Sequence, residues 1–106
     1  MSTDNFEQQF AEDNYYKLRL FVAGTSPASV RAIKNLGEIL ETQLPDKYEL
    51  EIIDIHQQPE LVQQENIAAV PTLIKTTPHP KRFLVGDMSD KAKVLRGLGI
   101  DNESTL

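Results

Sequence analysis

Residues 16–28 read YKLRLFVAGTSPA, and this stretch decides the fold class. Its apolar residues first alternate and then run together, which predicts an interior strand over 16–23 that is covered on both sides by its end. Gly24 ends the strand. Ser26 fits a helix N-cap, and Pro27 fits the first helical position. A strand followed at once by a capped helix is how a β-α-β unit begins.

The rest of the chain predicts a helix and then five more elements. The helix should end before Pro45, because a residue that precedes proline is biased away from helical dihedrals. Periodicity and the Pro and Gly breakers then predict a strand at 48–56, a helix at 59–66, strands at 72–76 and 81–85, and a helix at 89–98.

Two sets of apolar residues are predicted to be buried. The first helix carries one set at helical spacing: Val30, Ile33, Leu36 with Gly37, and Leu40. This face is therefore predicted to pack on the sheet. Ile52 and Ile53 are adjacent in the second strand, so we expect the centre of that strand to be covered on both faces.

The predicted order is β-α-β-α-β-β-α, an α/β class. The first β-α-β should be a right-handed parallel crossover, and the last two strands should form an antiparallel hairpin. A mixed four-stranded sheet flanked by helices is the thioredoxin arrangement. Thioredoxin-like folds start the first helix with a redox Cys-x-x-Cys, but residues 25–28 here read TSPA. Pro71 in Val70-Pro71-Thr72 resembles the cis-proline that faces this site; an ordinary trans proline is the alternative.

Composition excludes several classes of function. The 106 residues suit one domain, and they contain no Cys, so disulfides, thiolate zinc sites and thiol redox chemistry are excluded. The net charge of −5 argues against non-specific nucleic-acid binding. There is no membrane-length apolar run and no secretory signal, so we expect a soluble cytoplasmic domain.

The charges fall in blocks along the chain. Residues 1–13 carry −4 and residues 101–106 carry −2, and we expect these to be a flexible acidic arm and a short acidic tail. Residues 14–37 carry +4, residues 38–65 carry −7, and residues 66–100 carry +4. Such blocks suggest charge-steered contact with a partner, or a mixed surface whose signs interleave after folding.

Residues that could carry chemistry are few. Asp54 and His56 could be two metal ligands, but a metal site needs three or four, and no third ligand has a recognisable spacing. A hydroxyl at Thr25 or Ser26 needs a neighbouring base to act as a nucleophile. We therefore expect no catalytic residue, no metal and no cofactor. The alternative is a Cys-less thioredoxin-like enzyme that acts on a thiol substrate through one of these hydroxyls.

Four segments together resemble one family. They are LFVAGTSPASVRA at 20–32, AVPTLIK at 69–75, PHPKRFLVGDMS at 78–89 and KVLRGL at 93–98. The chain resembles the KaiB family of circadian-clock proteins over about residues 16–100, without an evident gap. The resemblance implies a KaiB-like domain at 14–100.

This resemblance implies a non-catalytic protein that binds the KaiC ATPase ring. Family members also bind KaiA or displace an output histidine kinase from the ring. The family is metamorphic: a homo-oligomeric ground state, usually a tetramer, has the order β-α-β-β-α-α-β, and a thioredoxin-like monomer binds KaiC. A stand-alone sensory module that binds KaiC is a further alternative.

Particular residues carry these expectations. Arg31, Lys34 and Arg82 match basic positions of the family, and Lys75 follows the Pro-Thr-Leu segment. These four are candidate KaiC contacts, and Asn66 occupies a position that is often Lys. Gly97 and Gly99 lie in the candidate fold-switch region, where residues 94–100 fit both helical and strand periods. Gly99 replaces a common Asp. The alternative is that both glycines only fray a terminal helix.

Overall fold

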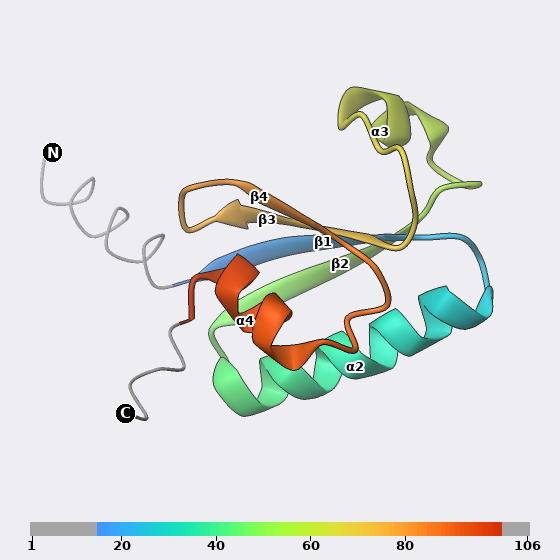
Figure 1. Cartoon of the computed structure of the whole chain (residues 1–106). Helices are drawn as coiled ribbons and strands as arrows, with labels where there is room; N and C mark the ends of the chain where they lie inside the picture. Colours follow the sequence, from blue (N-terminus) through green and yellow to red (C-terminus); the bar gives the residue numbers. More distant parts are fainter. Residues whose placement is uncertain (1–14, 101–106) are drawn as a thin grey trace, which may run out of the picture.

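The computed structural model describes residues 15–100, which form a four-stranded sheet with helices on both faces (Figure 1). The elements are β1 (Tyr16–Val22), α2 (Pro27–Gln43), β2 (Tyr48–Asp54), α3 (Pro59–Gln64), β3 (Thr72–Thr77), β4 (Arg82–Val85) and α4 (Lys91–Leu98). The predicted order is confirmed, with bounds that shift by one or two residues. The predicted arm at 1–13 and tail at 101–106 lie outside the described residues.

The strands lie in the order β2-β1-β3-β4. β1 is parallel to β2 and antiparallel to β3, and β3 is antiparallel to β4. β1 is therefore an interior strand, as predicted, and β2 and β4 are the edges of the sheet.

Each face of the sheet has its own apolar core. Leu18, Leu20 and Val22 of β1 pack against α2 and α4 on one face, whereas Phe21 joins Ile53 and Ile74 on the face that α3 covers. Figure 1 shows α2 and α4 together on one side and α3 alone on the other. Within residues 15–100, no helix is long and apolar enough to cross a bilayer.

The buried face of α2 differs from the prediction. Its inward residues are Ser29, Ala32, Leu36, Ile39 and Leu40. Val30 and Ile33 are instead 52% and 38% exposed. Small side chains at 29 and 32 let the helix approach the sheet closely, and this rotates the larger apolar residues outward. Ile52 was also predicted to be buried and is 42% exposed, because β2 is an edge strand.

Both glycines of α4 have a structural reason. Gly97 is buried where α4 meets β4, and a Cβ atom there would lie 2.5 Å from the side-chain carbons of Leu84. Gly99 ends the helix in the left-handed region with φ 78°. Its N–H donates to the Arg96 carbonyl at 3.0 Å, a common helix ending that favours glycine. Gly97 is thus a packing contact as well as a weak helix former.

We predict that Gly97→Val lowers the free energy of unfolding by about 2 kcal/mol, because Leu84 must leave its position. Urea denaturation followed by circular dichroism measures this change. In a Leu84→Ala background the same substitution should cost at least about 1 kcal/mol less, since the two side chains no longer compete for space. If Gly97→Val lowered the free energy of unfolding equally in both backgrounds, the close contact between residue 97 and Leu84 would be contradicted.

Candidate functional site

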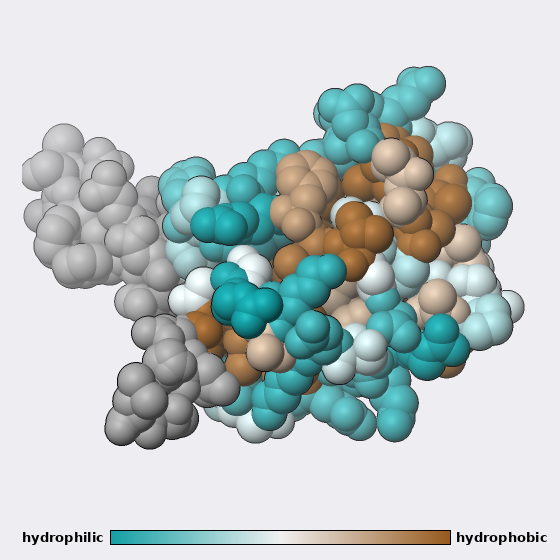
Figure 2. Space-filling view, viewed as in Figure 1, coloured by the Kyte–Doolittle hydropathy of each residue, from teal (hydrophilic) through white to brown (hydrophobic). Residues whose placement is uncertain are grey.

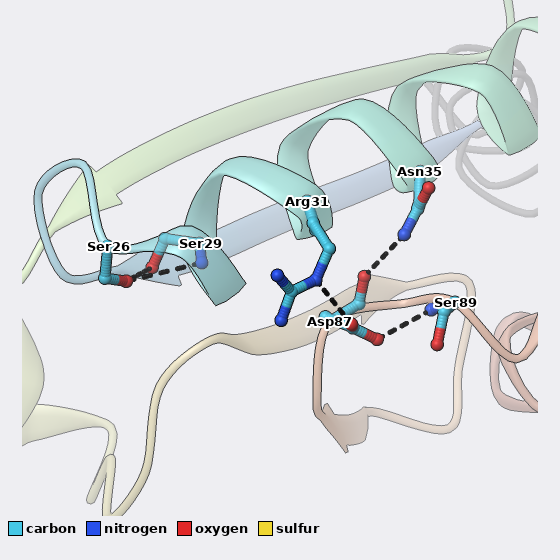
Figure 3. Close-up of polar contacts among 6 residues, drawn as sticks. All are labelled: Ser26, Ser29, Arg31, Asn35, Asp87 and Ser89. Carbon is cyan, nitrogen blue, oxygen red and sulfur yellow. Dashed lines mark hydrogen bonds and ion pairs between the residues drawn. The ribbon is translucent and has the colours of Figure 1, made fainter.

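The loop that precedes α2 occupies the position of the redox motif in thioredoxin-like folds. The Ser26 hydroxyl accepts a hydrogen bond from the Ser29 N–H at 3.3 Å and donates one to the Ser29 Oγ at 2.9 Å (Figure 3). The Ser29 Oγ also accepts from the Ala23 N–H at 3.0 Å, and Ser29 is fully buried. These hydroxyls therefore close the turn between β1 and α2. Ser26 acts as the predicted N-cap, and the role of Ser29 was not predicted.

The surroundings of this loop offer little for nucleophilic catalysis. Within residues 15–100, neither hydroxyl is hydrogen-bonded to a histidine or a carboxylate that could act as a base. Pro71 is buried, and the Val70–Pro71 peptide bond is cis. Asp54 accepts a hydrogen bond from the His56 N–H at 2.9 Å, and the described part of the chain contains no cluster of three metal-ligating side chains.

A polar clamp joins α2 to the loop between β4 and α4 (Figure 3). The Arg31 Nε lies 3.0 Å from the Asp87 Oδ2, and the Asn35 side chain donates to the Asp87 carbonyl at 3.0 Å. The Ser89 N–H donates to the Asp87 Oδ1 at 3.1 Å. Hydrogen bonds from Ser89 and from Arg31 lower the pKa of Asp87 from 3.8 to about 2. Arg31, a predicted contact, is therefore also a structural residue.

The second predicted contact on α2 is more exposed. Lys34 lies 3.7 Å from Glu38 on the same helix, and both side chains are largely in solvent, so this pair contributes little to stability. Beside Lys34 are the outward-facing Val30 and Ile33. We call Val30, Ile33 and Lys34 the α2 surface.

Asn66 lies on the opposite layer, just after α3. It is exposed and has φ 58°, in the left-handed region that asparagine tolerates better than most residues. The sheet separates Asn66 from Arg31 and Lys34, so the five predicted contacts do not form one surface.

Lys75 and Arg82 face each other across β3 and β4. Lys75 is only 3% exposed, and its Nζ donates to the Pro78 carbonyl at 2.7 Å. Burial, and to a lesser degree the Arg82 charge, lower the pKa of Lys75. In this fold Lys75 is an interior residue rather than a surface contact, whereas Arg82 is exposed.

An apolar surface lies on the α3 face of β4, whereas Arg82 points to the opposite face, as Leu84 does. Phe83 and Val85 on β4 are 49% and 52% exposed. Phe83 pairs with Ile74, and the half-buried Ile67 and Val70 pack against the cluster that contains Ile74. Figure 2 shows apolar side chains gathered between β4 and α3. We call Phe83, Val85, Ile67 and Val70 the β4 surface; the sequence patterns did not predict it.

The charge blocks interleave where the strands meet. Arg19 lies 3.2 Å from Glu51 and 3.7 Å from Glu65, and Lys81 lies 3.0 Å from the other Glu65 oxygen. The acidic middle block therefore neutralises parts of both basic blocks. Glu65, at the end of α3, also ties that helix to β1 and to the start of β4.

Comparison with known proteins places this geometry in a family. The sequence model of the KaiB domain matches residues 19–100. The circadian clock oscillator protein KaiB of Picosynechococcus is 48% identical over 86% of this chain and 88% of its own length. The protein of the same name from Trichodesmium erythraeum is 48% identical over 80% of this chain and 82% of its own length.

Solved structures agree on the fold. The N-terminal domain of Synechococcus elongatus SasA has a TM-score of 0.67 at 26% identity, covering 85% of this chain and 88% of that domain. The Drosophila melanogaster thioredoxin Deadhead has a TM-score of 0.66 at 16% identity, covering 93% of this chain and 92% of that protein. At this identity the likeness supports the fold and nothing about function. The thioredoxin-like prediction is confirmed.

We predict that the Asp87 clamp loses its stabilising effect in acid. Because the folded-state pKa of about 2 lies below the ordinary 3.8, the clamp contributes fully above pH 3.8 and is lost as pH falls through 2. The difference in unfolding free energy between wild type and Asp87→Asn should therefore shrink from pH 4 to pH 2. Urea titrations at each pH measure it. Asn35→Ala is the control, since its lost hydrogen bond involves no ionisable group; a constant Asp87→Asn difference would contradict the assignment.

Proposed function

Because this chain belongs to the KaiB family, we propose that it is a non-catalytic regulatory protein that binds a KaiC-type ATPase ring in a circadian clock or a timing system derived from one. The relatives named as clock oscillator proteins support the clock role. The extension to KaiC comes from the resemblance and from the surfaces described above. Three further properties stay predictions: a cytoplasmic location, a ground state with the order β-α-β-β-α-α-β, and a homo-oligomer that is a tetramer or a dimer.

The β4 surface is the observation that carries this proposal. An exposed apolar area with a polar border is typical of a site that another protein covers. Phe83 and Val85 supply the apolar centre. Lys81, which lies 5.6 Å from the Phe83 ring and pairs with Glu65, and the predicted contact Asn66, which follows Glu65, supply the border. Arg82, another predicted contact, points to the opposite face of the strand. We therefore assign KaiC binding to this surface.

The α2 surface supports a second partner. Val30 and Ile33 are exposed next to Lys34, and Arg31 continues the basic border. Ile52 is exposed on β2, which is an edge strand of the sheet that residues 15–100 form. We assign KaiA or an output histidine kinase, the other partners that the resemblance implies, to this side of the molecule.

The alternatives have less support. An enzyme that uses Thr25 or Ser26 would need an activated hydroxyl, and the Ser26 hydroxyl is already held by Ser29. A stand-alone sensory module would be expected to resemble the SasA domain more than KaiB. The identity is 26% to the SasA domain and 48% to KaiB from Picosynechococcus.

We predict that Val85→Ser weakens binding to a KaiC-type hexamer with ATP by at least about tenfold, because apolar side chains at the centre of an interface dominate its affinity. Fluorescence anisotropy of the labelled chain measures the dissociation constant. Val30→Ser is a matched control, since Val30 is also 52% exposed but lies on α2; it should change affinity less than about twofold.

Two results would count against this assignment. Loss of binding in Val30→Ser but not in Val85→Ser would move the KaiC site to the α2 surface. If the wild-type chain formed no complex with the hexamer on a sizing column, the KaiC proposal itself would fail.

A further inference from the structure

The helix α3 is weakly attached to the sheet by its apolar side chains. It has 6 residues, none of which is buried, and within residues 15–100 the side chain of its N-cap residue Gln58 makes no capping hydrogen bond. Leu61 and Val62 are only half-buried. A hollow of about 120 Å³ remains under the helix, lined in part by Val62, Ile67 and Val70. A helix this short is not stable by itself, so its position depends on other contacts.

Glu65, the C-cap residue of α3, supplies such contacts. One of its carboxylate oxygens lies 3.7 Å from the Arg19 Nη1 on β1, and the other lies 3.0 Å from the Lys81 Nζ, just before β4. The Glu65 side chain is 19% exposed, so solvent screens these two ion pairs less than it screens a pair on the open surface. A carboxylate at the C-terminus of a helix is disfavoured by the helix dipole. Glu65 therefore stabilises the docked position of α3 rather than the helix itself.

The end of α3 is continuous with the β4 surface. Asn66 has φ 58°, and the Ile67 N–H donates to the Val62 carbonyl at 3.0 Å, as in a Schellman helix ending. This hydrogen bond fixes Ile67, a member of the β4 surface, to α3. Lys81, at the border of that surface, lies 5.6 Å from the centre of the Phe83 ring. One carboxylate therefore holds both the helix that carries one side of the surface and the cation at its border.

We propose that Glu65 is a positioning residue: its ion pairs with Arg19 and Lys81 hold α3 on the sheet and thereby set the shape of the β4 surface. When these pairs are broken, residues 59–70 open as a local unit while the sheet stays folded. The opening is a property of this chain alone. Its effect on partner binding rests on the proposed KaiC function.

Amide hydrogen exchange followed by NMR tests the opening without any partner. The amides of residues 65–67 are hydrogen-bonded to carbonyls of α3, so they report its docked state. In Glu65→Gln they should exchange at least about fivefold faster, whereas Leu20 and Leu73 in the sheet change less than about twofold. Glu51→Gln is the matched control, because Glu51 also pairs with Arg19, at 3.2 Å, but lies on β2. Faster exchange at 65–67 in the control as well, equal acceleration in the sheet, or no change in Glu65→Gln would overturn the proposal.

Salt separates the ion pairs from other effects of the substitution. The Debye length falls to about 3 Å at about 1 M salt, so exchange at 65–67 in the wild type should speed up at least about threefold between low and high salt. In Glu65→Gln the same change should be less than about twofold, since the pairs are already absent. An equal salt effect in both chains would contradict the role of the ion pairs.

Binding to a KaiC-type hexamer with ATP tests the positioning role. Glu65→Gln should raise the dissociation constant at least about threefold, and Glu51→Gln should change it less than about twofold. Arg19→Gln leaves the Glu65 carboxylate in place and should weaken binding too, which a direct contact between Glu65 and the ring would not explain. Unchanged affinity in Glu65→Gln despite faster exchange would contradict the positioning role alone. If the wild type formed no complex, the proposed function would fail, whereas the exchange and salt results would still decide the opening.

Discussion

β1 needs cover on both of its faces, and the arrangement of the other elements depends on this need. Leu20 and Phe21 are adjacent, fully buried and on opposite sides of the sheet. The face with Leu20 is covered by α2 and α4, with 17 and 8 residues. Among residues 15–100, the face with Phe21 is covered by α3 alone, with 6 residues. A helix that short cannot cover four strands, and so the part of this face on β4 remains exposed.

This asymmetry links the fold to the proposed function. Thioredoxin-like proteins do chemistry at the start of the first helix, where the helix dipole stabilises a thiolate. Here that position holds Ser26 and Ser29, whose hydroxyls bond to each other and to the backbone. In this chain these hydroxyls close the turn between β1 and α2. What the fold offers to other molecules is the exposed surface beside α3.

Local sequence patterns predicted the helices and strands well, but they predicted poorly which face of α2 and β2 is buried. The cap at Ser26 and the helix end before Pro45 depend on nearby backbone, so the sequence reveals them directly. The buried side of α2 is set by its contact with the sheet. Ser29 and Ala32 are on this side, whereas helical periodicity predicted Val30 and Ile33 to be buried. Ile52 was misjudged because nothing local shows that its strand is an edge.

The candidate site depended still more on long-range contacts. Lys75 was a candidate contact because it follows the Pro-Thr-Leu segment, but its amine donates to the Pro78 carbonyl in the interior. The Arg31 clamp involves Asp87, 56 residues away, and no spacing rule joins the two. Phe83 and Val85 alternate as in any half-buried strand, and only the short reach of α3 shows that their face stays open.

Hydrogen–deuterium exchange with and without a KaiC-type hexamer and ATP tests the central claim most directly. If the surface beside α3 binds the ring, amides at 66–70 and 82–85 should exchange several-fold more slowly in the complex, while those at 29–34 keep their rates. Protection confined to 29–34, or no protection in a complex shown to form, would contradict the account.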